Sequence, residues 1–262
     1  MTATGPQFIT SAGNALLKDL RRLAQDSTAY RRQGRVWLEG DHLCRAALAR
    51  SVVPALAVFS QSQWEEAGQR WPHLATRAVV VADALFPTLS GLESPGRMGF
   101  VIDLPAAAPV RPETPSVILD RLQDAGNVGA ILRCAAAFGF PQVLALKGTA
   151  ALWSPKVLRA GMGAHFGLHL VEGLEASALE ALRVPIVATS SHAGEWLHRA
   201  VLPWPCAWAF GHEGRGLGEE IASRAGAAVR IVQPGGEESL NVAAAAAICL
   251  HASAAAPEKH VG

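Results

Sequence analysis

Short apolar runs alternate with longer segments of helical periodicity along the second half of the chain. The apolar runs cover residues 117–120, 142–147, 166–171, 185–190, 206–210 and 227–232. Strands separated by helices in this way are typical of an α/β fold, in which a mostly parallel sheet is covered on both faces. The pattern therefore predicts such a sheet for residues 116–262.

The first hundred residues are patterned differently. Helical periodicity and β-rich runs alternate there, with helices expected at 14–24 and 41–50 and strands at 52–59, 78–82 and 98–102. This pattern predicts a small α/β domain. Residues 104–115 then hold four prolines, a density that neither a helix nor a central strand tolerates. We therefore expect two domains, 1–103 and 116–262, joined by a proline-rich linker.

Polar side chains gather at three places where a predicted strand leads into a predicted helix. They are Asp120, Asn127 and Arg133 at the first junction, Glu213 in a glycine-rich turn at the second, and Ser239 and Asn241 at the third. In open α/β sheets, ligands bind at the carboxyl ends of strands, and the N–H groups that open a helix form a donor surface. The three junctions therefore predict one composite site for a polar ligand.

Composition indicates a compact soluble protein. Half of the chain is hydrophobic and 17% is charged, which favours a well-filled core over disorder. The four cysteines are scattered without a CxxC pair or a matched histidine spacing, so we expect reduced thiols in the cytoplasm and no metal site. The start of the chain lacks the pattern of a secretory signal. The longest apolar run, 242–250, is shorter than the ~20 residues that span a bilayer.

The charge distribution and the glycine spacing argue against some classes of function but do not identify one. The net charge is +1, although six basic residues against three acidic ones lie in the first forty. This local excess could bind phosphate or be a solvated helix face. Neither DAGNVGA (124–130) nor GHEGRGLG (211–218) fits the glycine fingerprint of a dinucleotide fold or a P-loop. Both of those nucleotide sites are therefore disfavoured.

Four segments resemble, in order, the motifs of the SpoU (TrmH-like) family of SPOUT methyltransferases. They are NVGAILRCAAAFG (127–139), SPKVLRAGMGA (154–164), GHEGRGL (211–217) and ESLNVAAAAAI (238–248). The N-terminal part is similar, more weakly, to the ribosomal-protein-like (L30e-like) RNA-binding domain that many members carry. The chain departs from the family at Ala125-Gly126, where Asp-Pro is common, and at Val232-Gln233, where Pro-Met is common.

This resemblance implies a fold, an activity and a cofactor. The fold would be an α/β SPOUT domain with a deep trefoil knot, beside the small N-terminal domain, in a homodimer. The activity would be methyl transfer from S-adenosyl-L-methionine to a ribose 2′-hydroxyl of RNA without a metal, with ribosomal RNA favoured and transfer RNA possible. Backbone groups of Gly211, Ile231 and Leu240 would hold the cofactor, which agrees with the close approach that glycine permits.

Catalytic roles follow from the same resemblance. Arg133 would hold the RNA backbone and stabilise the developing alkoxide, as suits a permanently charged guanidinium. Asn127 would orient Arg133 or the ribose, or else only cap its helix. Glu213 would hold Arg133 or its own loop, or else be a solvated turn residue. Ser239 and Asn241 would position the nucleotide and support the cofactor loop, with helix capping as the alternative.

Two other classes of function remain at this stage. One is an RNA-binding protein without turnover, in which the sheet serves as a dimerisation scaffold. The other is a nucleotide-dependent oxidoreductase of the α/β type, against which the missing glycine fingerprint argues.

Overall fold

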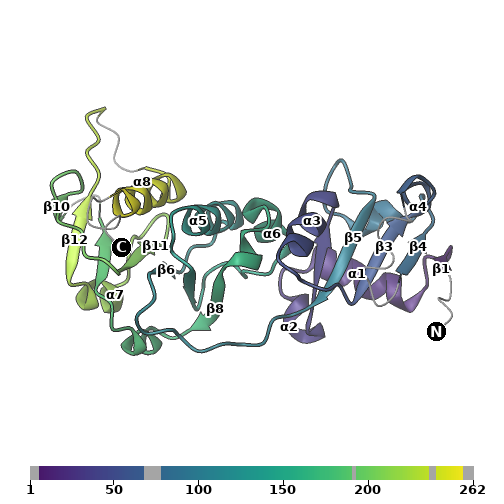
Figure 1. The fold of residues 1–262 in the computed structure, drawn as a ribbon, viewed down its shortest axis with the longest axis horizontal. Helices are drawn as coiled ribbons and strands as arrows, with labels where there is room; N and C mark the ends of the chain where they lie inside the picture. The colour runs from purple at the N-terminus through teal and green to yellow at the C-terminus, as the bar shows by residue number, and fades with distance from the viewer. Residues whose placement is uncertain (1–5, 68–77, 191–192, 236–239, 256–262) are drawn as a thin grey trace. The chain divides into compact units, whose positions relative to one another are not determined.

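The chain divides into two compact units, which we describe separately (Figure 1). Unit 1 comprises Met1–Ala106 and Trp153–Phe166, and unit 2 comprises Ala107–Leu152 and Gly167–Gly262. The structure is a computed structural model, and it describes residues 6–67, 78–190, 193–235 and 240–255.

Unit 1 contains a five-stranded sheet in the order β1-β4-β3-β5-β2. Strands β1, β4 and β3 run parallel, whereas β5 is antiparallel to both β3 and β2. The strands are Gln7–Ile9 (β1), Arg35–Glu39 (β2), Leu56–Ser60 (β3), Ala78–Val81 (β4) and Met98–Asp103 (β5). The helices are Ala15–Gln25 (α1), Ala29–Gln33 (α2), Asp41–Ala49 (α3), Gln61–Ala67 (α4) and Pro155–Gly161 (α6), with 3-10 turns at Phe86–Leu89 and Ala164–Gly167.

Unit 2 contains a seven-stranded sheet in the order β10-β12-β9-β11-β6-β7-β8. All the strand pairs described in it are parallel. The strands are Ser116–Asp120 (β6), Gln142–Leu146 (β7), His169–Leu174 (β8), Ile186–Thr189 (β9), Glu195–Trp196 (β10), Ala207–Gly211 (β11) and Ala227–Arg230 (β12). The helices are Ala125–Ala137 (α5), Glu219–Arg224 (α7) and Val242–Ala254 (α8), with a 3-10 turn at Ala176–Ala181.

Both faces of the unit 2 sheet are covered, which explains why its strands are apolar without alternation. Along β11, Ala207 and Ala209 belong to a core cluster that includes Ile221 of α7. Trp208 is fully buried and donates from Nε1 to Ser253 Oγ of α8 at 2.9 Å. Helices α5 and α8 lie side by side (Figure 1) and pack on the central strands β6, β7 and β11.

The predicted α/β fold with a mostly parallel sheet is confirmed. All six strands predicted in 116–262 are present within a few residues, and the largest shift affects the strand expected at 166–171. It begins at His169, because Ala164–Gly167 forms a 3-10 turn. Three short strands, β1, β2 and β10, were not predicted. The two or three residues of β10 and β1 are too few to establish a period, and the five residues of β2 show three consecutive buried positions instead of an alternation.

The segment Trp153–Phe166 packs within unit 1, although its sequence motif belongs to the predicted methyltransferase half. Ser154 caps α6 by accepting from Val157 N–H at 3.4 Å, and α6 contacts α1 and β2. Arg159 lies 3.7 Å from the buried carboxylate of Glu39. The domain boundaries at the proline-rich segment therefore stay a prediction.

Candidate active site

The sheet order of unit 2 brings the first two junctions to one edge. Strands β6 and β11 are neighbours, and their last residues, Asp120 and Gly211, are paired in register. Strand β6 leads into α5, and β11 leads into residues 212–218, which we call the glycine-rich loop. Helix α8, which begins at the third junction, packs against both α5 and β11. Three loops that are distant in sequence thus meet at the carboxyl ends of the central strands.

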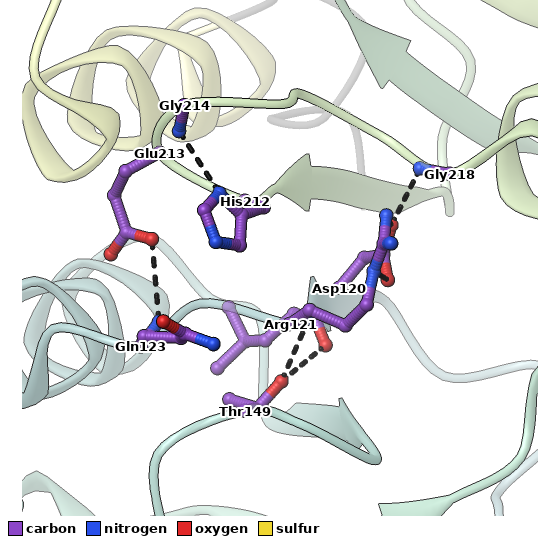
Figure 2. Close-up of polar contacts among 9 residues, drawn as sticks. Asp120, Arg121, Gln123, Thr149, His212, Glu213, Gly214 and Gly218 are labelled. Carbon is purple, nitrogen blue, oxygen red and sulfur yellow. Dashed lines mark hydrogen bonds and ion pairs between the residues drawn. The ribbon is translucent and has the colours of Figure 1, made fainter.

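The carboxylate of Glu213 fastens the glycine-rich loop to the start of α5. Its Oε1 accepts from the Asp124 N–H at 3.1 Å and from Asn127 Nδ2 at 3.3 Å, and its Oε2 accepts from the Gln123 N–H at 3.3 Å. Figure 2 shows Glu213 pointing toward Gln123. Partial burial raises the pKa of Glu213, but its own N–H and these donors together lower it more. The pKa therefore lies below its ordinary value of 4.5, and the carboxylate is charged at neutral pH.

Asn127 connects Glu213 to the third junction. Its Oδ1 accepts from Asn241 Nδ2 at 2.9 Å, while its Nδ2 donates to Glu213. Asn241 also caps α8, because its Oδ1 accepts from the N–H groups of Ala243 and Ala244 at 2.9 and 3.2 Å. We call these three side chains the Glu213–Asn127–Asn241 network. It joins all three junctions.

The structure shows which residues cap helices α5 and α8. Asp124, and not Asn127, is the N-cap of α5, since its Oδ1 accepts from the Asn127 N–H at 2.7 Å. The capping alternative for Asn127 is therefore wrong. For Asn241, capping and the contact with Asn127 occur together. Ser239 lies outside the described residues.

Arg133 lies on the exposed surface of α5, six residues after Asn127. At 100° per residue, the two side chains point ~120° apart around the helix axis. In the part of the chain that the structure describes, Arg133 makes no hydrogen bond or ion pair. The carboxylate of Glu213 binds residues at the start of α5, and it does not bind the Arg133 side chain.

The glycine-rich loop folds back on Gly211, the strand residue that precedes it. A Cβ added at Gly211 would lie 2.2 Å from both Gly216 C and Leu217 N, so only glycine fits there. The Gly216 N–H donates to the His212 carbonyl at 2.8 Å, and the Gly214 N–H donates to His212 Nδ1 at 3.0 Å. This second contact is visible in Figure 2. The loop is therefore compact, and three of its seven residues, Gly214, Gly216 and Gly218, have no side chain.

The end of β12 and the chain beyond it carry apolar surface and buried polar atoms without a hydrogen-bond partner in the described part of the chain. Ile231 is half-buried, whereas Val232 and Leu240 are 45% and 39% exposed. Arg230 Nε and Gln233 Oε1 are buried and have no hydrogen-bond partner among the described residues. Buried polar atoms normally find a partner. This surface suits a ligand with an apolar ring face and a polar edge, as a nucleoside has.

Sequence reasoning missed several residues of the site. Asp124 and the Gln123 main chain hold Glu213 and the start of α5, and an Asp immediately before a helical segment is a readable capping signal. Asp120 ends the predicted strand at the first junction, but the sequence indicated no role for it. It is 3% exposed and bonded to Arg121 and Gly218. A carboxylate that ends a fully apolar strand was the available signal.

No metal-binding group is found where the structure describes the side chains: no three His, Cys, Asp or Glu residues are suitably grouped. The cysteines are free thiols, and burial raises the pKa of Cys249 to about 12. Among the described helices, none is long and apolar enough to cross a membrane.

Comparison with known proteins gives a family match over residues 115–251, to the SpoU rRNA Methylase family. The uncharacterized tRNA/rRNA methyltransferase of Synechocystis is 32% identical over 260 residues, which cover 93% of this chain and 92% of that protein. Mitochondrial rRNA methyltransferase 3 of mouse is 34% identical over 174 residues, or 62% of this chain. That alignment spans only 41% of the mouse protein.

Solved structures agree over almost the whole chain. The AdoMet-bound rRNA methyltransferase of Sinorhizobium meliloti has a TM-score of 0.82 and 26% identity, with 94% of this chain and 97% of that chain covered. An RNA 2′-O ribose methyltransferase has a TM-score of 0.77 and 29% identity, with 94% and 98% covered.

Proposed function

Since the chain belongs to the SpoU rRNA Methylase family, we propose that it methylates a ribose 2′-hydroxyl of RNA, with S-adenosyl-L-methionine as the methyl donor. The observation that supports this most is the Glu213–Asn127–Asn241 network. Its three residues come from three of the four segments that resemble the family motifs, and they lie at the sheet edge where α/β folds bind ligands. A protein that only binds RNA would not require these side chains together.

The cofactor would bind through this chain's backbone beside the glycine-rich loop. The missing side chain of Gly211 lets the main chain of Gly216 and Leu217 pack against it. The main chain at Gly211, Ile231 and Leu240 would hold the adenosine, with the exposed apolar side chains nearby covering its ring. The unsatisfied Arg230 and Gln233 atoms fit a ligand with hydrogen-bonding edges. Bound S-adenosyl-L-methionine supplies an electrophilic methyl group on a sulfonium. The relative from Sinorhizobium meliloti is AdoMet-bound.

The protein's own contribution is to align and activate the ribose hydroxyl, which is a poor nucleophile at neutral pH. The Arg133 guanidinium would bind the RNA phosphate beside the target and stabilise negative charge developing on the oxygen. Its very high pKa makes it a poor base, so the proton passes to a phosphate oxygen or to water. Asn127 and Glu213 would keep the start of α5 in place, and Asn241 and Ser239 would position the nucleotide.

Several further properties belong to this proposal. Ribosomal RNA is the favoured substrate, because the relatives from mouse and Sinorhizobium meliloti are described as rRNA methyltransferases. Transfer RNA is the alternative substrate, since the Synechocystis relative is described as a tRNA/rRNA methyltransferase. We also propose a cytoplasmic homodimer, a knotted C-terminal chain and an L30e-like RNA-binding role for the N-terminal domain. Mapping 2′-O-methyl sites in total RNA from cells with and without the gene would identify the target.

The Arg133→Ala variant tests the catalytic assignment. It should abolish methyl transfer while the affinity for S-adenosyl-L-methionine stays within about threefold, because the side chain is expected to contact RNA and not the cofactor. Transfer of labelled methyl to the mapped RNA and calorimetry with the cofactor would measure the two effects. Arg183→Ala is the matched control, since Arg183 is an exposed arginine of unit 2 whose Nη1 lies 3.7 Å from the Glu113 carboxylate. Near-normal turnover of Arg133→Ala would refute the assigned role.

A further inference from the structure

We propose that Asp120 and Arg121 form a positioning pair that fixes the base of the glycine-rich loop and, through it, the cofactor site. This inference rests on the proposed function, because the effect of the pair would be seen in cofactor binding. Neither residue is assigned a role by the family motifs described above.

Asp120 holds both ends of the glycine-rich loop. At the entrance, Asp120 is the register partner of Gly211, the last residue of β11. At the exit, its Oδ2 accepts from the Gly218 N–H at 2.7 Å. Figure 2 shows this contact beside the Asp120 side chain. One buried residue of β6 therefore determines where the loop leaves the sheet and where it returns to start α7.

Arg121 fixes the orientation of that carboxylate. Its Nε and Nη2 donate to Asp120 Oδ1 and Oδ2 at 2.8 and 3.0 Å, a bidentate arrangement that fixes geometry as well as charge. The Asp120 side chain is only 5% exposed, while that of Arg121 is 39% exposed. Asp120 cannot rotate away from Gly218 without breaking both contacts.

The backbone of Arg121 adopts a strained conformation at this place. Its φ is +60°, a conformation that costs energy in any residue with a side chain. The Arg121 N–H donates to Thr149 Oγ1 at 3.1 Å, and Thr149 Oγ1 donates to the Leu119 carbonyl at 3.0 Å. Such strain persists only where the surroundings enforce it, and it is common near functional sites.

The space around the pair is available because of two glycines. A Cβ added at Gly218 would lie 2.9 Å from Arg121 Nη2 and 3.3 Å from Asp120 Oδ2, and one at Gly148 would lie 3.2 Å from Arg121 Cγ. The loop thus returns to the sheet at a residue without a side chain, directly against the pair. The pair acts on the loop through main-chain contacts, so its two members are positioning residues.

The positions of Glu213 and Gly211 depend on the contacts that the Asp120–Arg121 pair makes at the two ends of the glycine-rich loop. Glu213 reaches α5 from within the loop, and Gly211 directly precedes the loop. If the exit of the loop moved, the main chain proposed to hold the cofactor would move with it. Loss of the pair should therefore weaken cofactor binding and leave the chemistry at a saturated site largely intact.

Two variants test the proposal, Asp120→Asn and Arg121→Gly. The first keeps the shape and removes the charge, and the second removes the guanidinium while giving the backbone a residue that adopts positive φ without steric strain. We expect calorimetry to show at least about tenfold weaker binding of S-adenosyl-L-methionine for both. The KM for the cofactor should rise equally, while kcat at saturating cofactor stays within about threefold of the original protein.

A matched control separates this effect from general destabilisation. Glu39→Gln neutralises a carboxylate that is 6% exposed and paired with an arginine in unit 1, and it should leave the cofactor Kd within about twofold. Unfolding midpoints are measured for all three variants. If Asp120→Asn does not fold, the cofactor affinity of Arg121→Gly alone tests the proposal. Folded variants that bind the cofactor as tightly as the original protein overturn the proposal, whereas an original protein that binds no cofactor overturns the proposed function as well.

Discussion

Each polar side chain of the Glu213–Asn127–Asn241 network takes its partner from another loop. Asn127 bonds Glu213 across 86 positions and Asn241 across 114. The residue types were readable from the sequence, but their partners were not. Asn127 sits where a helix cap was plausible, yet Asp124 caps α5 and leaves the Asn127 amide free to join the other two loops.

The charge on Glu213 gives a prediction about pH. Its folded-state pKa is lowered, so the stabilisation from its hydrogen bonds is complete above the ordinary value of 4.5 and is lost as the pH falls through the folded pKa. Glu213→Gln should therefore unfold more easily at neutral pH, by about 1 kcal/mol, and the difference should vanish in acid. Thermal unfolding across this range would measure it.

The control for this experiment is Glu219→Gln. That glutamate is exposed in the first turn of α7 and makes no hydrogen bond to any described residue. A difference between Glu213→Gln and the original protein that stayed constant down to strongly acid pH would show that the carboxylate charge is not what holds the loop.

At the scale of the element, helix α8 begins at a residue that also belongs to the candidate site. Its sequence is almost uniformly apolar, so periodicity alone does not fix its start or the face it buries. Asn241 fixes the start by capping two N–H groups, and the same side chain reaches Asn127. Helix placement and site geometry thus depend on one residue.

Asn241→Asp separates the two roles. The aspartate keeps the capping oxygen and suits the helix dipole, but it places an acceptor against Asn127 Oδ1. We expect an unchanged unfolding midpoint and at least about tenfold lower methyl transfer. Asn241→Ala should lose activity and also about 1 kcal/mol of stability. Normal turnover of the aspartate variant would show that the contact with Asn127 is dispensable.

At the scale of the whole molecule, α6 belongs to unit 1, although the sequence placed it in the domain expected at 116–262. The segment lies in sequence between strands β7 and β8 of unit 2. Its buried Val157 and Leu158 nevertheless belong to the same compact unit as α1 and β2. Each such side chain contributes roughly 1.5–3 kcal/mol when buried, so α6 depends on residues that precede the proline-rich segment.

A fragment of residues 107–262 tests this dependence. Without α1 and β2, the amides of α6 should exchange rapidly with solvent, because a helix of seven residues is not stable alone. In the full chain they should be protected. Hydrogen exchange followed by mass spectrometry would compare the two, with β6 and β11 as internal references. Equal protection of α6 in the fragment would contradict the assignment.

The order and type of most elements followed from the sequence alone, because hydrophobic periodicity is a local property. The polar ends of β6 and β11 and the start of α8 were visible for the same reason, and the motif resemblance indicated the family. Only the tertiary structure decided that β6 and β11 are neighbours, that Asn127 meets Glu213 and Asn241, and that Asp120 meets Gly218. These contacts depend on the order of strands in the sheet, which no local pattern encodes.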